Sequence, residues 1–214
     1  MSHPQKQYRD WWRVLRVFCY LALRPQDILN YCRFGVFTHK TPLELGMPWW
    51  SFGAVKYVGA RLNPESEVFE FGSGGSTVFM GARARSVTCV EDDIMWAQLV
   101  SKAAEERGLG GVSVLHRPFD FWRTETFGTS DYLLSLSGRT FDVIVVDGKE
   151  WSAQVRDLCF WRAEDYVKKG GIIVLDDSWR YPQAKRQNRA LRWHEFKGVG
   201  YCRAGVTSTC IFEY

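Results

Sequence analysis

The chain has 214 residues, of which 46% are hydrophobic and 24% are charged, a composition typical of one globular domain with a short extension. The net charge of +4 is small, and no basic stripe with interleaved aromatic residues stands out, so we expect no nucleic-acid partner. None of the six cysteines forms a C-x-x-C pair, which argues against a zinc site and favours a reducing, cytoplasmic setting.

Residues 8–23 form an apolar run interrupted by three arginines, which predicts a helix too short and too charged to span a bilayer. It has no small-residue cleavage site, so a signal peptide is not expected. Two interpretations stay open: the helix packs on the domain or on a second copy as a homodimer, or it lies peripherally on a membrane surface. Prolines and glycines in residues 24–48 indicate a connector with a short helix. We therefore divide the chain into a helical extension, 1–48, and a main domain, 49–214.

From residue 49 onward, apolar strand-like runs alternate with helical segments, which is the pattern of a parallel sheet covered by helices. Helices are predicted over residues 49–62, 75–84, 93–107 and 151–168. Strands are predicted over residues 67–71, 86–91, 112–116, 141–146, 171–176, 193–200 and 206–214. The runs at 141–146 and 171–176 are continuous and β-branched, as expected of strands buried on both faces. Residues 117–140 form a long aromatic and polar connection, and loops of that length are usually functional.

A glycine-rich turn follows the first strand of the main domain. The turn reads Gly72-Ser73-Gly74-Gly75-Ser76-Thr77, and the next strand ends at Glu91, which lies 19 residues after Gly72. Glycines let the backbone approach a ligand, and the helix that follows offers free N–H groups and the positive end of its dipole. An acid at the spacing of Glu91 can bind ribose hydroxyls. This order predicts a site for an adenosine-containing cofactor.

Two residues favour S-adenosylmethionine over a dinucleotide. The dinucleotide fingerprint needs a small residue for close packing where this chain has Thr77. Glu70 precedes the turn, where a carboxylate would repel a diphosphate but attract the ammonium of an amino-acid cofactor. We therefore predict Glu70 at the amino-acid end and Glu91 on the ribose, and Trp96 and Trp122 are candidates for stacking on adenine. The remaining predicted cofactor contacts are Gly72, Ser73, Gly74, Gly75, Ser76, Asp92 and Asp147.

Four segments of the chain resemble motifs of the class I S-adenosylmethionine-dependent methyltransferases. They read Glu-Phe-Gly-Ser-Gly-Gly-Ser-Thr at 70–77, Val-Glu-Asp at 90–92, Phe-Asp-Val-Ile-Val-Val-Asp-Gly at 141–148 and Gly-Gly-Ile-Ile-Val-Leu-Asp-Asp-Ser at 170–178. The resemblance implies an α/β fold with a Rossmann-like, seven-stranded and mostly parallel sheet. It also implies helices on both faces and an antiparallel last strand at the sheet edge. The later motifs further resemble a bacterial group of small methyltransferase-like proteins with poorly defined acceptors.

Acids also follow the fourth and fifth predicted strands, at the edge where open α/β sheets bind ligands. Methyl transfer to oxygen needs an aligned nucleophile and a base, and Asp147 and Asp177 are the catalytic candidates. Asp147, Asp176 and Asp177 together resemble the Mg²⁺-binding acids of some small-molecule O-methyltransferases, so the resemblance also implies a bound Mg²⁺. The alternative for Asp176 and Asp177 is that one acid caps the following helix while the other faces the pocket.

The sequence therefore predicts a methyltransferase that uses S-adenosylmethionine, most simply for O-methylation of a small-molecule or glycan-like acceptor. N-methylation stays open. Two alternatives belong to other classes: an NAD-type oxidoreductase, and a non-catalytic partner or membrane-surface module that acts through residues 1–48. We expect the N-terminal extension and the connection at 117–140 to shape the acceptor pocket.

Overall fold

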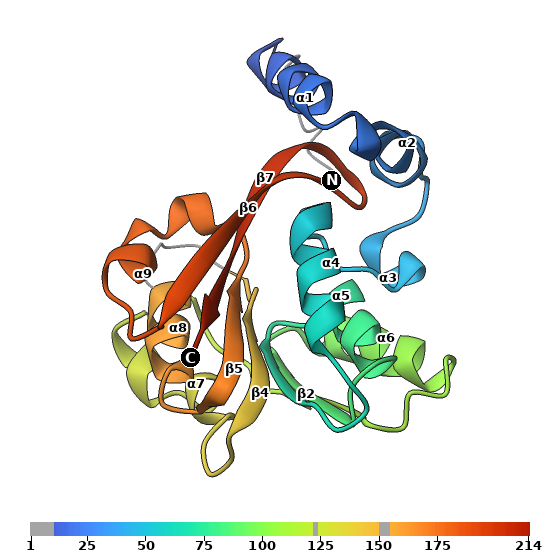
Figure 1. Ribbon diagram of the computed structural model, residues 1–214. Helices are drawn as coiled ribbons and strands as arrows, with labels where there is room; N and C mark the ends of the chain where they lie inside the picture. The colour runs from blue at the N-terminus through green and yellow to red at the C-terminus, as the bar shows by residue number, and fades with distance from the viewer. Residues whose placement is uncertain (1–10, 122–123, 150–154) are drawn as a thin grey trace.

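The computed structural model describes residues 11–121, 124–149 and 155–214. The strands of these ranges are β1 Glu67–Phe71, β2 Ser86–Glu91, β3 Val112–His116, β4 Phe141–Val146, β5 Val167–Leu175, β6 Arg192–Gly200 and β7 Arg203–Glu213. The α-helices are α1 Trp11–Leu23, α2 Ile28–Asn30, α3 Pro42–Leu45, α4 Phe52–Arg61, α5 Gly75–Gly81, α6 Ile94–Glu105, α7 Asp131–Leu134, α8 Val155–Ala163 and α9 Pro182–Arg186. Short 3-10 or π turns lie between several of them (Figure 1).

All the strands form one sheet in the order β3-β2-β1-β4-β5-β7-β6. Strands β1 to β5 are parallel, and β7 runs antiparallel to both β5 and β6. The predicted Rossmann-like, mostly parallel seven-stranded sheet with an antiparallel last strand is therefore confirmed. The predicted place of that strand is wrong, because β7 lies inside the sheet and β6 forms its edge. The burial of the two strands explains the order: β7 is buried along most of its length, whereas the first half of β6 is exposed and polar, as suits an edge.

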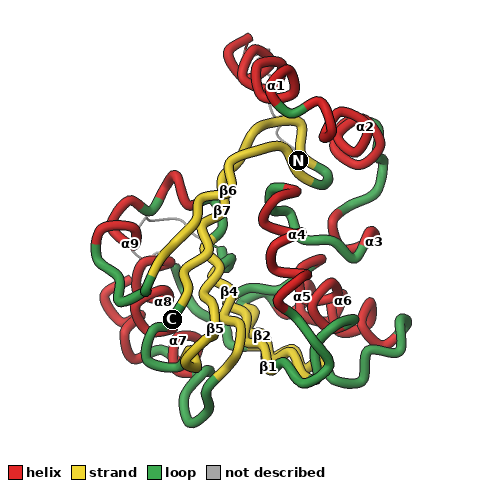
Figure 2. The backbone as a smooth tube through the Cα atoms, in the orientation of Figure 1, coloured by secondary structure: helices red, strands yellow, loops and turns green. Residues whose placement is uncertain are grey.

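Alternate residues of the strands face two separate cores, because successive side chains of a strand point to opposite sides of a sheet. On one side Phe69, Ile144 and Leu175 pack with residues of α7, α8 and α9. On the other side Val68 and Val145 pack with residues of α4 and α5. The ribbon shows the same two layers, with α4, α5 and α6 on one side of the sheet and α7, α8 and α9 on the other (Figures 1 and 2).

The segment between β4 and β5 differs from the prediction at its end. Helix α8 ends at Ala163, and β5 begins at Val167 rather than at residue 171. Val167 pairs with Phe141, and the register between β4 and β5 shifts before Val143. Lys168, Lys169 and Gly170 therefore lie in an irregular stretch of β5. Gly170 has φ +82°, which lets the chain make this irregularity. Residues 151–154 of the predicted helix lie outside the described residues.

Within the described residues of the connection at 117–140, the large aromatic side chains pack into the core. Phe121, Phe127 and Tyr132 are buried beside Phe71 of β1, and the rings of Phe71 and Tyr132 stack 5.9 Å apart. Burial of large aromatic residues stabilises the packing of this connection against the sheet. The aromatic character that marked the connection in the sequence is therefore largely explained by packing.

The N-terminal helices lie at one end of the molecule, on the hairpin formed by β6 and β7 (Figures 1 and 2). Val17, Tyr31 and Val199 form a small core there, and Tyr20 packs close to Gly198. The predicted N-terminal helix is observed from Trp11 onward, and it packs on the domain through Val17, Tyr20 and Leu21, while residues 8–10 lie outside the described residues. The boundary between residues 48 and 49 stays a prediction. Across 11–121, 124–149 and 155–214, no helix is both long and apolar enough to cross a bilayer.

Candidate cofactor and active site

The glycine turn sits where three segments of the chain meet. Gly72 has φ +90°, and a Cβ there would lie 2.8 Å from the Cα of Gly148, so the turn after β1 touches the loop after β4. A Cβ on Gly75 would collide with the carbonyl oxygens of Pro42 and Met47, so α3 and its flanks lie directly on the start of α5. Both positions need glycine because neighbouring backbone fills the space of a side chain.

Glu70 lies beneath this turn rather than in the open site. Its side chain is buried, with the residue only 1% exposed, and its two carboxylate oxygens accept hydrogen bonds from the hydroxyls of Ser76 and Thr77. Thr77 also accepts a bond of 2.9 Å from the N–H of Gly74, so the residue that departs from the dinucleotide pattern ties the turn to Glu70. Burial raises the pKa of Glu70 to about 8, against the hydrogen bonds from the two hydroxyls. Glu70 therefore shapes the turn from below.

Glu91 lies at the end of β2 and reaches the site. Its carboxylate accepts hydrogen bonds from the Ser73 hydroxyl at 2.7 Å and from the backbone N–H groups of Asp92 and Asp93. Burial raises the pKa of Glu91 to about 7. Glu91 lines a pocket of about 310 Å³. The other residues lining this pocket are Gly72, Ser73, Asp93, Trp96, Asp147 and Lys149.

Trp96 lines the same pocket, and Asp92 lies next to it through its ion pair with Lys149. The Trp96 indole donates a bond of 2.9 Å to the carbonyl of Ser73, which fixes the ring beside the glycine turn. The Asp92 carboxylate lies 3.7 Å from the Lys149 amine, and its carbonyl is 3.2 Å from His116 Nε2. Trp96 thus keeps its place as a candidate for adenine contact, whereas Trp122, the other candidate, lies outside the described residues.

The carboxylates after β4 and β5 converge as predicted, and each has protein partners. Asp147 accepts a bond of 3.1 Å from the Trp50 indole and forms an ion pair of 3.2 Å with Arg156. Burial raises the pKa of Asp147 above its ordinary value, and the Arg156 guanidinium opposes this. Arg156 itself is only 8% exposed and also donates to the carbonyls of Asp147, Gly148 and Asp176. Arg156 therefore holds the strand ends together.

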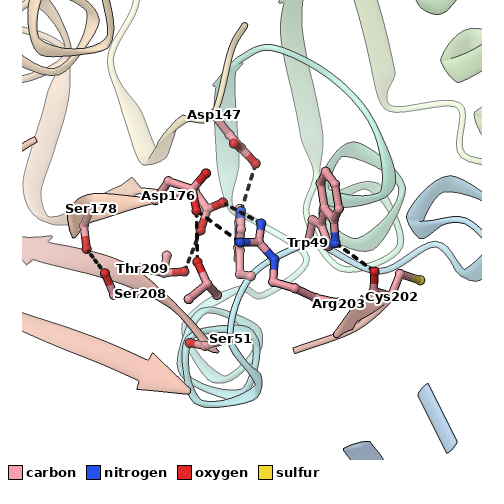
Figure 3. Close-up of polar contacts among 12 residues, drawn as sticks. Trp49, Ser51, Asp147, Asp176, Ser178, Cys202, Arg203, Ser208 and Thr209 are labelled. Atoms are coloured by element: carbon pink, nitrogen blue, oxygen red, sulfur yellow. Dashed lines mark hydrogen bonds and ion pairs between the residues drawn. The ribbon is translucent and has the colours of Figure 1, made fainter. Parts of the chain in front are cut away.

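Arg203, at the start of β7, reaches the two acids after β5 and lies beside Asp176 in Figure 3. It forms an ion pair of 3.1 Å with Asp177 and lies 3.8 Å from a carboxylate oxygen of Asp176. Asp176 accepts a bond of 2.7 Å from Thr209, and burial raises its pKa well above the ordinary value. Burial also acts on Asp177, but Arg203 and a bond from Thr207 outweigh it and hold the Asp177 pKa below its usual range.

This geometry overturns the capping interpretation for Asp176 and Asp177. Asp177 precedes a 3-10 turn, Ser178–Arg180, but its side chain makes no capping bond. It adopts φ +48°, which turns its carboxylate toward Arg203 and Thr207 of β7. Both acids are therefore held by side chains of the neighbouring strand.

The three acids do not fit the predicted Mg²⁺ site. A Mg²⁺ ion takes hard oxygen ligands in near-octahedral geometry, but Asp147 and Asp177 each pair with a guanidinium and Asp176 is satisfied by Thr209. Within the part of the chain that the structure describes, no group of three or more His, Cys, Asp or Glu side chains is arranged to hold a metal. We therefore derive no role for Mg²⁺.

A second cavity, of about 390 Å³, extends from the glycine turn toward the N-terminal segment. It is lined by Ser73 to Ser76 and Trp96 on one side, by Asp147, Asp176, Asp177, Arg156 and Arg203 at the strand ends, and by Thr41 to Leu43 and Trp49. The N-terminal extension thus reaches the pocket as expected. Within the described residues of the connection, 117–121 and 124–140, none lines this cavity, and Phe121, Phe127 and Tyr132 are buried in the core instead.

Sequence reasoning missed Arg156, Arg203, Trp49 and Trp50 as site residues. No local pattern marks them, because each comes from a segment that reaches the site only through folding of the sheet. The position of α3 did have a signal. Thr41 and Glu44 form a capping box, in which each side chain bonds the backbone N–H of the other residue, and the spacing of a Thr and a Glu around a Pro indicates such a helix start.

Solved structures of methyltransferases share this fold at low sequence identity. A candidate O-methyltransferase from Klebsiella pneumoniae is 16% identical and aligns with a TM-score of 0.57 over 95% of this chain and 97% of its own. A candidate methyltransferase from Streptococcus mutans, solved with S-adenosylhomocysteine, is 10% identical, with a TM-score of 0.57 over 83% of this chain and 100% of its own. An rRNA methylase from Streptococcus thermophilus is also 10% identical, with a TM-score of 0.56 over 82% and 98% of the two chains.

No curated protein matches the chain. The sequence model of a methyltransferase domain family matches residues 69–178, a span that contains the glycine turn, Glu91 and the acids after β4 and β5. This span is more than half of the 214 residues, and the chain therefore belongs to the class I S-adenosylmethionine-dependent methyltransferases.

Proposed function

We propose that this protein binds S-adenosylmethionine at the strand ends and methylates a hydroxyl group of a small-molecule or glycan-like acceptor. The observation that carries the proposal is the position of Asp147. It lines both the pocket that contains Glu91 and the larger cavity that contains Arg203 and Trp49. Asp147 therefore lies where the two spaces join, and a cofactor in one space would meet an acceptor in the other beside this carboxylate.

The residues around the turn suit S-adenosylmethionine. Glu91 offers carboxylate oxygens to a pair of ribose hydroxyls, and its bonds to Ser73 and to the N–H groups of Asp92 and Asp93 fix its orientation. The glycines of the turn leave room for close backbone approach, and Trp96 borders the same pocket. When bound, S-adenosylmethionine supplies an electrophilic methyl group on a positively charged sulfur.

Asp147 is the candidate base. Its raised pKa makes its carboxylate a better proton acceptor than Asp177, whose pKa is held low by Arg203. A base near an acceptor hydroxyl takes its proton as the oxygen attacks the methyl group, and such catalysis contributes about 10²- to 10⁴-fold in rate. We assign Asp177 the role of positioning Arg203.

The size of the larger cavity and the residues around Trp49 favour a small-molecule acceptor. A space of about 390 Å³ is in the range of small-molecule sites. Trp49 is half exposed beside Arg203, whose guanidinium lies 4.8 Å from the ring centre, so an aromatic face and a positive charge lie together. This pair suits a hydroxylated ring such as a sugar better than a base within a nucleic-acid helix. The rRNA methylases among the structural neighbours share only the fold with this chain.

Titration calorimetry with S-adenosylhomocysteine tests the cofactor site. We expect Glu91→Gln to weaken binding by about 10- to 100-fold, since it removes charged hydrogen bonds to the ribose. The matched control is Glu105→Gln, at an exposed position of α6. NADH is titrated in parallel. Equal affinity of the wild type and Glu91→Gln, or tighter binding of NADH, would contradict the assignment.

The base is tested separately by methyl transfer from S-adenosylmethionine to a panel of hydroxylated acceptors, with and without Mg²⁺. We expect Asp147→Asn to lower kcat by about 10²- to 10⁴-fold at saturating S-adenosylmethionine. Saturation keeps any change in cofactor affinity at this pocket-lining residue out of the comparison. An Asp147→Asn variant with the activity of the wild type would refute the role of Asp147 and leave the cofactor assignment intact.

A further inference from the structure

The positive charge of the chain is concentrated at its N-terminal end. Residues 1–48 contain seven Lys and Arg and three Asp and Glu, whereas residues 49–214 contain 21 of each kind. The whole net charge of +4 therefore lies in the first 48 residues. Among residues 11–40, which we call the N-terminal layer, the one acid is Asp27, and its carboxylate accepts a bond of 2.6 Å from the Tyr20 hydroxyl.

The same layer exposes large apolar side chains. In α1, Val17, Tyr20 and Leu21 pack toward the hairpin of β6 and β7. Val14 and Phe18, one helical turn apart, are 60% and 70% exposed. Leu15 is also exposed. A soluble helix normally turns one apolar face to the core, and α1 presents a second one to its surroundings.

Exposed apolar residues continue into the next helical turns. Leu23, Leu29 and Phe37 are 82%, 77% and 72% exposed. Arg16, Arg24 and Arg33 are exposed in the same stretch of chain. Helices α1 and α2 lie beyond the β6–β7 hairpin, at the opposite end of the molecule from α7 and α8 (Figures 1 and 2). Exposed apolar side chains and arginines thus share one end of the molecule.

We propose that the N-terminal layer binds the surface of an anionic lipid bilayer. A helix with an exposed apolar face and flanking arginines can lie in the plane of the interface, with its apolar side chains among the acyl chains and its arginines on anionic headgroups. This proposal rests on the charge distribution and the exposed side chains, and it does not depend on the proposed reaction.

A second copy of the chain and a nucleic acid are two other possible partners of the N-terminal layer, and both fit less well than a lipid surface. A second copy of the chain would place the same positively charged layer against itself, since a two-fold interface pairs one patch with its own copy. A nucleic acid would bind the arginines through its phosphates but would leave Val14, Leu15 and Phe18 without apolar contacts. A lipid surface satisfies both the charge and the apolar area.

Docking would also place the active site near the membrane. The β6–β7 hairpin that supports α1 carries Arg203, and Arg203 and Trp49 line the cavity. The Trp49 indole donates a bond of 3.1 Å to the carbonyl of Cys202, within the turn of this hairpin. The layer and the acceptor side of the cavity are therefore connected through a single short turn.

Vesicle flotation of the full chain tests the proposal, with vesicles of phosphatidylcholine alone and vesicles in which part of it is replaced by phosphatidylglycerol. We expect binding to the anionic vesicles, weaker binding to the neutral ones, and a loss of binding as salt is added. The double variant Leu15→Ser with Phe18→Ser should bind about tenfold or more weakly. The double variant Arg16→Glu with Arg24→Glu should lose the preference for anionic vesicles.

The matched controls change exposed residues elsewhere: Leu191→Ser for the apolar variant and Arg186→Glu for the charge variant. Thermal unfolding of every variant checks that the fold is kept. The proposal is overturned if the wild type does not bind anionic vesicles, or if the controls weaken binding as much as the α1 variants. It is also overturned if sedimentation shows a dimer that Phe18→Ser dissociates.

Discussion

Replacing Glu70 by glutamine separates two possible roles of this acid, one in the fold and one in cofactor binding. The Glu70 carboxylate is buried and accepts hydrogen bonds from Ser76 and Thr77. A glutamine has the same shape, and its amide can accept from one hydroxyl and donate to the other. Glu70→Gln therefore removes the titrating group while it keeps the packing and both hydrogen bonds.

The magnitude follows from the pKa. Burial raises the pKa of Glu70 from 4.5 to about 8. Because the folded-state pKa is raised, the stability that Glu70 contributes is fully present below 4.5 and is lost as the pH rises through about 8. A shift of this size corresponds to at most about 5 kcal/mol in the free energy of unfolding. Glu70→Gln should be as stable as the wild type near pH 4.5 and more stable than the wild type above about pH 8.

Urea unfolding of both proteins across this pH window measures the difference. Glu91, whose pKa is also raised, is present in both proteins, so most of its effect cancels; the part that remains is its charge interaction with Glu70. Glu105→Gln at an exposed position serves as the control and should leave the pH profile of the wild type unchanged. A difference between Glu70→Gln and the wild type that stays constant across the window would refute the reasoning.

S-adenosylhomocysteine titration of the same variant addresses the second role. The sequence predicts that Glu70 faces the ammonium of the cofactor, whereas the structure places its carboxylate on Ser76 and Thr77. If Glu70 acts from beneath the turn, Glu70→Gln should keep its affinity within a few-fold. A loss of tenfold or more in affinity, without a loss of stability, would mean that an ionised Glu70 contacts the cofactor.

Two further substitutions test the packing around the site, and a third tests an ion-pair cluster at the far end of β7, where Glu213 lies opposite Ile172. Gly75→Ala should lower the free energy of unfolding by about 1–3 kcal/mol and weaken S-adenosylhomocysteine binding, because its Cβ would displace the α3 segment; Gly128→Ala, which has open space, is the control in urea unfolding. Arg156→Met should cost about 3–5 kcal/mol in the same assay, because it removes a buried guanidinium that pairs with Asp147 and donates to three backbone carbonyls. Glu213→Gln should cost about 1–2 kcal/mol at neutral pH, since solvent screens its exposed partners. Arg192 and other partners lower the Glu213 pKa to about 2. The cost of Glu213→Gln should therefore vanish as the pH falls from 4.5 toward 2. A cost that does not change with pH would show that the ionised carboxylate is not what stabilises the fold.

The buried strands and the glycine turn could be read from the sequence. Strands β1, β2, β3 and β4 begin and end at the predicted residues, because continuous apolar and β-branched runs bounded by glycines and polar residues leave few alternatives. Glu91 was also placed correctly at the end of β2, since the order of strand, turn, helix and strand fixes its position along the chain.

The polar partners of the candidate site could not be read in the same way. The sequence grouped Asp147, Asp176 and Asp177 correctly, because the carboxyl ends of neighbouring parallel strands share one edge. It suggested a metal there because the arginines that neutralise these acids come from elsewhere, Arg156 from α8 and Arg203 from β7. Their approach depends on how the last hairpin and α8 pack on the sheet, and no local pattern records that packing.

The sequence by itself thus determined the order of strands and helices, the glycine turn and the acids that follow the strands, since these depend on local periodicity and on short-range geometry. Only the tertiary structure decided that β7 inserts between β5 and β6, that Phe121, Phe127 and Tyr132 pack in the core, and that Glu70 supports the turn from below. Each of these outcomes depends on which surfaces bury one another and which buried charges find partners. Burial and pairing are properties of segments far apart in the chain, so they are settled only when the whole chain packs.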